Sequence, residues 1–247
     1  MDVLENHIDK LRELNSSLEQ TLYGTNTGGK SWYDEFWDNI QDYGKLKDYT
    51  YAFGTGWNGQ NFKPKYDFKI KSMYGMFYHF GSYTRDGIIH NGFDFKGCLE
   101  KAGVKLDMSQ TIGVTQAFMY CKIAHLPPLD FRNVISLSSV FRESYTTSVE
   151  ITLRGDGTNT FDANCFWAEK LESLTVNGVI GNTVTFNKCT KLSKASIENI
   201  ISCLSSTASG MILTLSTTAV NNAFGGSTSE EWLNLVATKP NWTISLS

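Results

Sequence analysis

VKLDM (104–108), LDF (129–131), VEITL (149–153) and LTV (174–176) are copies of one short pattern, in which apolar residues alternate with others. The last apolar residues of successive copies lie 23, 22 and 23 residues apart. An aromatic residue follows each copy, namely Phe118, Phe141, Phe166 and Phe186. A fixed period in the twenties is the signature of a solenoid, in which each repeat supplies one short strand and a return segment. The sequence therefore predicts an α/β fold, a leucine-rich-repeat-type solenoid of short parallel strands with helical or irregular returns.

The alternation also predicts what the strands expose. Successive side chains of a strand point to opposite faces, so their neighbours line the concave face if Leu106, Leu129, Ile151 and Leu174 point inward. These candidate binding residues are Lys105, Asp107, Asp130, Arg132, Glu150, Thr152, Arg154, Thr175 and Asn177. The face is polar and mixed in sign, which suits recognition, although any solvated sheet face has such a composition.

The repeat lengthens after Leu192, and the rest of the chain reads as a C-terminal cap. We expect a helix over 193–205 with Ser193 as its N-cap, a strand at 211–215 and a short helix at 216–224. A capping box starting at Thr228 opens a final helix, and a strand at 241–246 closes the chain. We assign the solenoid to 72–247, with 72–103 as an atypical first repeat.

Residues 1–23 predict a coiled-coil oligomerisation helix, because one set of residues recurs at alternating spacings of four and three. This seam consists of Leu4, Ile8, Leu11, Asn15, Leu18 and Leu22. So short a helix is marginal alone in water, and a seam asparagine typically fixes register and oligomer state. We expect a homo-oligomer, with a trimer favoured over a dimer. The alternative is a helix packed on its own domain.

Residues 24–30 contain three glycines and predict a flexible linker. An aromatic-rich connecting module follows at 31–71, with an amphipathic helix at its start and strand fragments at 49–53 and 66–70. We interpret its aromatic face, with Trp32 and Trp37, as core or subunit packing. A carbohydrate-stacking surface is the alternative.

Composition limits the function classes. The net charge is −3, so a nucleic-acid footprint is not expected. The sequence contains no apolar run long enough for a membrane span, and its first residues contain no signal-peptide pattern, so we expect no export by the general route. The five cysteines lack a C-x-x-C pair, which favours reduced, structural thiols.

Catalytic and metal sites are not predicted, nor is any cofactor. The four histidines have no metal-ligand spacing, and His79 and His90 are a weak candidate for a zinc pair. Asp107 and Asp130 on adjacent strands would lie about 5 Å apart by sheet spacing. A glycosidase needs two carboxylates that face one cleft, but the sequence indicates no pocket around these two. We expect a protein that is not an enzyme.

The segments CTKLSKASIENIISCLSSTASGMILTLSTTAVNNAFG (189–225) and EEWLNLVATKPNWTISL (230–246) resemble the C-terminal repeats of BspA-like leucine-rich-repeat proteins. They are especially similar to members encoded by phages and prophages of gut Firmicutes, which LENHIDKLRELNSSLEQTL (4–22) and YDEFWDNIQDYG (33–44) also resemble. The sequence departs from secreted adhesins of the family, since it has neither their signal sequence nor their wall anchor. The resemblance implies a solenoid binding protein and, for phage members, a virion appendage or host-contact role.

We therefore expect a virion-associated protein, assembled in the host cytoplasm. It would present its solenoid faces from an oligomeric stalk to a protein or glycan on the host surface, so that weak contacts add through avidity. The alternatives are an intracellular protein that binds a host factor during infection and a bacterial surface adhesin.

Overall fold

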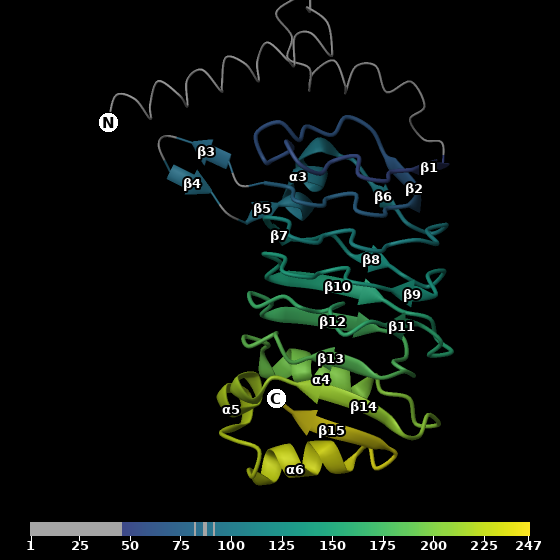
Figure 1. Ribbon diagram of the computed structural model, residues 1–247, viewed down its shortest axis with the longest axis vertical. Helices are drawn as coiled ribbons and strands as arrows, with labels where there is room; N and C mark the ends of the chain where they lie inside the picture. The colour runs from purple at the N-terminus through teal and green to yellow at the C-terminus, as the bar shows by residue number, and fades with distance from the viewer. Residues whose placement is uncertain (1–45, 82, 86–87, 91) are drawn as a thin grey trace, which may run out of the picture. The chain divides into compact units, whose positions relative to one another are not determined.

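The computed structural model describes residues 46–81, 83–85, 88–90 and 92–247. The predicted coiled-coil helix (1–23), the linker (24–30) and the start of the aromatic module (31–45) lie outside the described residues. The described chain is a mixed α/β structure of short, mostly parallel strands and few helices (Figure 1).

The elements before residue 126 are β1 (Leu46–Asp48), β2 (Phe68–Ser72), β3 (Tyr83–Arg85), β4 (Ile88–His90), β5 (Phe93–Asp94), α3 (Phe95–Ala102), β6 (Leu106–Asp107) and β7 (Ile123–His125). The middle elements are β8 (Leu129–Asp130), β9 (Ser136–Leu137), β10 (Ser148–Thr152), β11 (Thr160–Phe161), β12 (Ser173–Asn177) and β13 (Val184–Phe186). The last elements are α4 (Lys194–Ser202), β14 (Met211–Leu215), α5 (Thr217–Phe224), α6 (Glu230–Ala237) and β15 (Trp242–Leu246).

The first parallel sheet has the strand order β12-β10-β7-β5, and β8 also pairs with β10. Leu129, Ile151 and Leu174 are buried beneath it, as the alternation predicts, whereas Leu106 in β6 is only half-buried. In register, however, Ile151 pairs with Val176 rather than with Leu174. The shift is of two residues, and because side chains alternate with a period of two, the same residues still face inward. Upstream, β2 pairs with β1 and with β6, both in parallel.

A second set of parallel pairs lies one turn further along each repeat. β9 pairs with β11, and β14 pairs with both β13 and β15. The core between the strand sets is apolar, and it includes Val134, Leu137, Val184 and Leu213.

The third side of each repeat is an irregular segment, and these segments form what we call the turn column (residues 51–53, 74–79, 115–120, 138–143 and 165–167). Backbone hydrogen bonds connect successive segments: the amides of Phe77, Phe118 and Phe141 donate to the carbonyls of Ala117, Val140 and Cys165, at 2.8, 2.9 and 2.9 Å. The buried backbone is therefore satisfied across repeats although no strand forms there.

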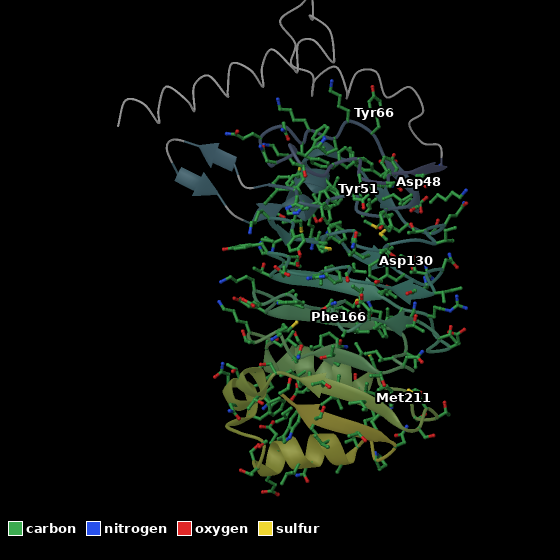
Figure 2. All side chains as sticks on the ribbon, viewed as in Figure 1. Asp48, Tyr51, Tyr66, Asp130, Phe166 and Met211 are labelled. Atoms are coloured by element: carbon green, nitrogen blue, oxygen red, sulfur yellow. The ribbon has the colours of Figure 1, made fainter. Side chains whose placement is uncertain are left out.

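Six buried phenylalanines stack beneath the turn column, and Figure 2 labels one of them, Phe166. The ring centroids of Phe118 and Phe141 are 5.8 Å apart with an interplanar angle of 5°, and those of Phe141 and Phe166 are 5.7 Å apart. The same stack extends to Phe186 in one direction and through Phe77 to Phe53 in the other. The four aromatic residues that recur in the repeat pattern are thus core residues, and two earlier ones join them.

Residues 49–53, predicted as a strand fragment, form a turn instead. Tyr51 has a φ of 53°, in the left-handed region, and the amides of Tyr51 and Phe53 donate to the carbonyls of Tyr74 and Met76 in the next segment. Tyr51 is exposed and Phe53 is buried, so the alternation of aromatic residues reflects two positions of a turn and not the two faces of a strand. The predicted module boundary at 71/72 falls inside β2.

The cap elements form at the predicted places. Ser193 caps α4, and its hydroxyl accepts from the Ser196 amide. The N-cap of α6 is Ser229 rather than Thr228, because the Ser229 hydroxyl accepts from the Trp232 amide. Helix α4 lies along the open edge of β12, where the Ser196 hydroxyl accepts from the Leu174 amide at 3.0 Å and Asn199 Oδ1 accepts from the Val176 amide at 2.7 Å.

Candidate binding site

The strands of the first sheet and of its upstream neighbour present one polar face, which we call the polar strand face. Six of the predicted binding residues take alternate, non-buried positions on β6, β8, β10 and β12: Asp107, Asp130, Glu150, Thr152, Thr175 and Asn177. Thr152 lies between Asp130 and Asn177 in register, and Glu150 pairs with Thr175. Asn177 Nδ2 donates to Glu150 Oε1 at 2.8 Å, so neighbouring strands are also connected through their side chains.

The other three predicted residues lie at strand ends. Lys105 precedes β6, and Arg132 and Arg154 follow β8 and β10. Arg132 Nη2 donates to Asp130 Oδ2 at 2.7 Å and its Nε donates to Oδ1 at 3.0 Å. Arg154 makes the same two-pronged contact with Asp156, at 3.2 Å each. Both guanidinium groups are therefore held by a carboxylate two residues away.

Asp107 and Asp130 are not paired in strand register, although the charge of Asp130 acts on Asp107 and counteracts the lowering of its pKa. Asp107 pairs in register with Lys69 of β2, and Asp130 pairs with Thr152. Hydrogen bonds from Ser109 lower the pKa of Asp107, and hydrogen bonds from Arg132 lower the pKa of Asp130. Both carboxylates are therefore ionised at neutral pH, whereas the acid of a glycosidase pair needs a raised pKa.

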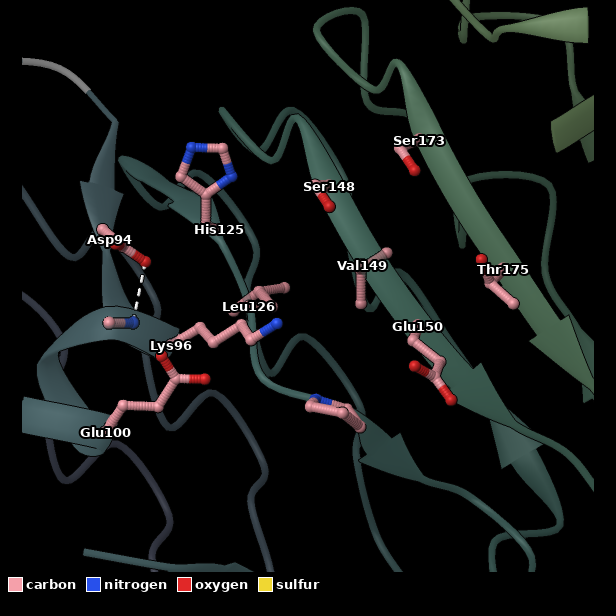
Figure 3. Close-up of a pocket in the computed structure, with 12 residues that line it drawn as sticks. Asp94, Lys96, Glu100, His125, Leu126, Ser148, Val149, Glu150, Ser173 and Thr175 are labelled. Atoms are coloured by element: carbon pink, nitrogen blue, oxygen red, sulfur yellow. Dashed lines mark hydrogen bonds between the residues drawn. The ribbon is translucent and has the colours of Figure 1, made fainter. Parts of the chain in front are cut away.

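A pocket of about 430 Å³ opens beside this face, between α3 and the first residues of β10 and β12. Figure 3 shows Lys96 and Glu100 of α3 on one side of it and Glu150 and Thr175 of the sheet on the other, with His125 at one end. Asp94 is held at the start of α3, where its carboxylate accepts from the Gly97 amide at 2.9 Å. Leu126, Pro128 and Val149 supply the apolar part of the lining.

The pocket is dominated by hydrogen-bonding groups. It has three carboxylates, from Asp94, Glu100 and Glu150, against the single ammonium of Lys96. Hydroxyls of Ser148, Ser173 and Thr175 complete the lining. Such a lining can donate to and accept from a polar ligand, and its carboxylates favour a neutral or cationic one.

Sequence reasoning missed the α3 side of the pocket and also Lys69. The pattern Phe68-x-Ile70 continues the repeat upstream of Val104, with both residues fully buried, but its aromatic surroundings pointed to a connecting module. The contributions of Asp94, Lys96 and Glu100 depend on where α3 meets the sheet, which no local pattern encodes.

The structure offers little for metal chemistry. Within the described ranges, no group of three or more His, Cys, Asp and Glu side chains could hold a metal ion. The ring of His79 stacks on Tyr120, with centroids 4.8 Å apart. All five cysteines are free thiols, and Cys121, Cys165 and Cys189 are buried.

None of the helices described in the structure is long and apolar enough to cross a membrane. The predicted oligomerisation residues, Leu4, Ile8, Leu11, Asn15, Leu18 and Leu22, lie outside the described residues.

Comparisons of the sequence with protein-family models, with curated proteins and with solved structures returned no match. The resemblance to BspA-like proteins therefore stays a prediction from residues 189–225 and 230–246. The case for a function rests on the geometry of the polar strand face and its pocket.

Proposed function

We propose that this chain is a non-enzymatic binding protein, built as a leucine-rich-repeat-type solenoid and displayed on a phage particle. The polar strand face and the adjoining pocket would contact a protein or a glycan on the host cell surface. The residues at 1–23 would form a coiled-coil stalk that presents several copies of this face, so that weak individual contacts add through avidity.

The observation that carries the proposal is the continuity of the polar strand face. Glu150 and Thr175, and likewise Thr152 and Asn177, are neighbours on adjacent strands, and the first pair also lines the pocket. A ligand bound there meets rigid strands rather than loops, which lowers the entropy cost of ordering its contacts. The lowered pKa values of Asp107 and Asp130 favour recognition over acid–base catalysis at this face.

The solenoid assignment is supported by the recurring registers. Thr152 pairs with Asp130, 22 positions earlier, and Ile151 pairs with Val176, 25 positions later. The stack of buried phenylalanines follows a similar spacing. In such an array each repeat is stabilised by its neighbours, and the exposed faces are free to vary for binding.

The binding proposal is tested with fluorescently labelled chain on cells of the bacterium that carries the gene. We expect saturable binding, and we expect Glu150→Ala to weaken it about tenfold, which corresponds to the loss of one well-placed contact. Ile135→Ala is the matched control, because Ile135 is exposed and does not line the pocket. Equal binding by wild type and Glu150→Ala would contradict the assignment of this face.

The stalk and the location are tested separately. Light scattering should give a trimer or dimer for the full chain and a monomer for a version that starts at Lys30. A seam variant with Leu11→Asp and Leu18→Asp should also be a monomer. Mass spectrometry of purified particles should detect the chain. Its absence from particles, together with one stoichiometric partner captured from host cytosol, would favour the intracellular alternative, and a signal at the bacterial surface without phage would favour an adhesin.

A further inference from the structure

A second surface lies on the outside of the turn column, on residues that the polar strand face does not use. Four successive repeats carry the same triplet, an outward residue, a small buried residue and another outward residue. The triplets are Tyr120-Cys121-Lys122, Glu143-Ser144-Tyr145, Trp167-Ala168-Glu169 and Lys188-Cys189-Thr190. The middle residues are at most 5% exposed. We call the surface band formed by these triplets, which is hollowed at its middle around Ser144, the outer groove.

The repeats are in direct contact along this groove. The amide of Tyr120 donates to the carbonyl of Arg142 at 2.9 Å, and the amide of Glu143 donates to the carbonyl of Trp167 at 2.6 Å. On the other row, the amide of Tyr145 donates to the carbonyl of Cys121 at 2.9 Å. Each repeat therefore sits one strand spacing, about 4.8 Å, from the next. A pocket of about 240 Å³ marks the middle of the groove, lined by Lys122, Glu143, Ser144, Tyr145, Trp167, Glu169 and Lys170.

Cations order the aromatic rings of the groove. Lys122 Nζ lies 5.9 Å from the ring centroid of Tyr145, and Lys188 Nζ lies 5.7 Å from that of Trp167. The Arg142 guanidinium lies 5.5 Å from the Trp167 centroid and 5.9 Å from that of Tyr120. An exposed cation–π contact is weak. A ring of a bound ligand can therefore take the place of the lysine ammonium over Tyr145 or Trp167 at a small cost in free energy.

The charges of the central pocket balance. Lys122 and Lys170 face Glu143 and Glu169, which gives two cations and two anions. A polyanion such as single-stranded nucleic acid would need a basic excess, which neither the pocket nor the chain has. Carboxylates that accept and ammonium groups that donate, placed beside aromatic rings, suit a neutral ligand rich in hydroxyl groups.

From this geometry we infer that the outer groove binds a linear, neutral glycan. The spacing of the repeats favours a glycan over a peptide. A sugar unit in an extended glycan is close in length to one repeat step, whereas an extended peptide advances about 3.3 Å per residue and loses register with it. The two central repeats then each offer one aromatic ring and one carboxylate to a sugar unit: Tyr145 with Glu143, and Trp167 with Glu169. This site is separate from the polar strand face and does not depend on the virion role proposed above.

The test uses the full chain and isothermal titration with chitohexaose, cellohexaose and maltohexaose. We expect saturable binding of at least one of the three. Tyr145→Ala and Glu169→Ala should each weaken it about tenfold, because each removes one ring or one acceptor from the groove. Glu169 is exposed, so its replacement leaves the core untouched. Ile135→Ala, at an exposed residue that lines neither the outer groove nor the pocket of the polar strand face, is the matched control and should bind the glycan like the wild type.

Three results would overturn the inference. The first is no binding of any of the three glycans. The second is binding that both Tyr145→Ala and Glu169→Ala leave unchanged. The third is tighter binding of heparin or of single-stranded DNA through the same two residues, which would assign the groove to a polyanion.

Discussion

Asn159 offers a sharp test of how the repeats are held together. It is fully buried in the return segment after β10. The Arg154 amide donates to its Oδ1 at 2.7 Å, and its Nδ2 donates to the carbonyls of Val134 at 2.7 Å and Phe131 at 3.2 Å. The Asn159 side chain therefore forms hydrogen bonds with the backbone of its own turn and with the backbone of the turn in the preceding repeat.

Asn159→Ala removes all three hydrogen bonds at once. The Phe131 carbonyl still accepts from the Val134 amide, but the Arg154 amide and the Val134 carbonyl lose the partner that Asn159 supplied. At about 1–3 kcal/mol for each of the two orphaned groups, the free energy of unfolding should fall by about 2–6 kcal/mol. For a domain of this size that lowers the Tm by about 4–24 °C.

Asn133→Ala is the matched control. Asn133 is exposed and makes a single contact between repeats, from its Nδ2 to the Ser109 carbonyl at 2.6 Å. Water can replace that bond, so the loss should stay under about 1 kcal/mol. Urea unfolding followed by far-UV circular dichroism measures both variants. A loss under about 1 kcal/mol for Asn159→Ala, or equal losses for the two variants, would refute the account of Asn159 as the buried link between turns.

Three further predictions follow from the core and from the ionisable groups. Phe141→Ala should lower the free energy of unfolding by about 3–5 kcal/mol, because it leaves a ring-sized cavity between Phe118 and Phe166; a loss under about 1 kcal/mol would mean that the stack closes up. Burial alone would raise the pKa of Asp162, but the Ser139 amide and the hydroxyls of Ser138 and Ser139 outweigh it and lower that pKa. Asp162 therefore stabilises the fold above its unfolded pKa of about 3.9 and ceases to do so as the pH falls through the folded pKa. Acid titrations of stability should consequently be shallower for Asp162→Asn than for the wild type, and parallel curves would contradict this. Burial raises the pKa of Cys121 and of Cys189 to about 12, so Ellman's reagent at pH 8 should reach these thiols only after unfolding, and rapid labelling of either in the native chain would disprove their burial.

The strand faces could be predicted because the signal is local. Ile151 and Leu174 each lie between polar neighbours, and Leu129 precedes Asp130, so the alternation indicates which residues are buried. The register could not be predicted in the same way. Counting from the last apolar residue aligns Leu153 with Val176, whereas the structure pairs Ile151 with Val176. The paired positions are 25 residues apart there, against 22 between Leu129 and Ile151, so the repeat length varies and a fixed period misplaces the register.

The candidate sites were predictable only in part. The polar strand face follows from the same alternation, and its central residues lie where the sequence places them. The pocket beside it depends on α3, which reaches the sheet only through the tertiary fold. The outer groove had a sequence signal in its triplets, but Cys121, Ser144 and Ala168 share only small size. Small size is too common to mark a repeat by itself. The triplets can be recognised only after the turns have been aligned on Phe118 and Phe141.

The two strand sets end differently, and that difference bears on how such a chain could change length. Helix α4 closes the edge of β12 with Ser196 and Asn199, while β13 continues the second strand set into β14 and β15. Duplicating a unit between β10 and β12 would preserve α4 and its contacts, and would lengthen both candidate surfaces by about 4.8 Å. A unit inserted after Leu192 would separate β12 from its cover and expose a sheet edge, a known route to aggregation. We therefore expect repeat units added by gene duplication, or by design, to be tolerated upstream of Leu192. Units added after Leu192 should be selected against.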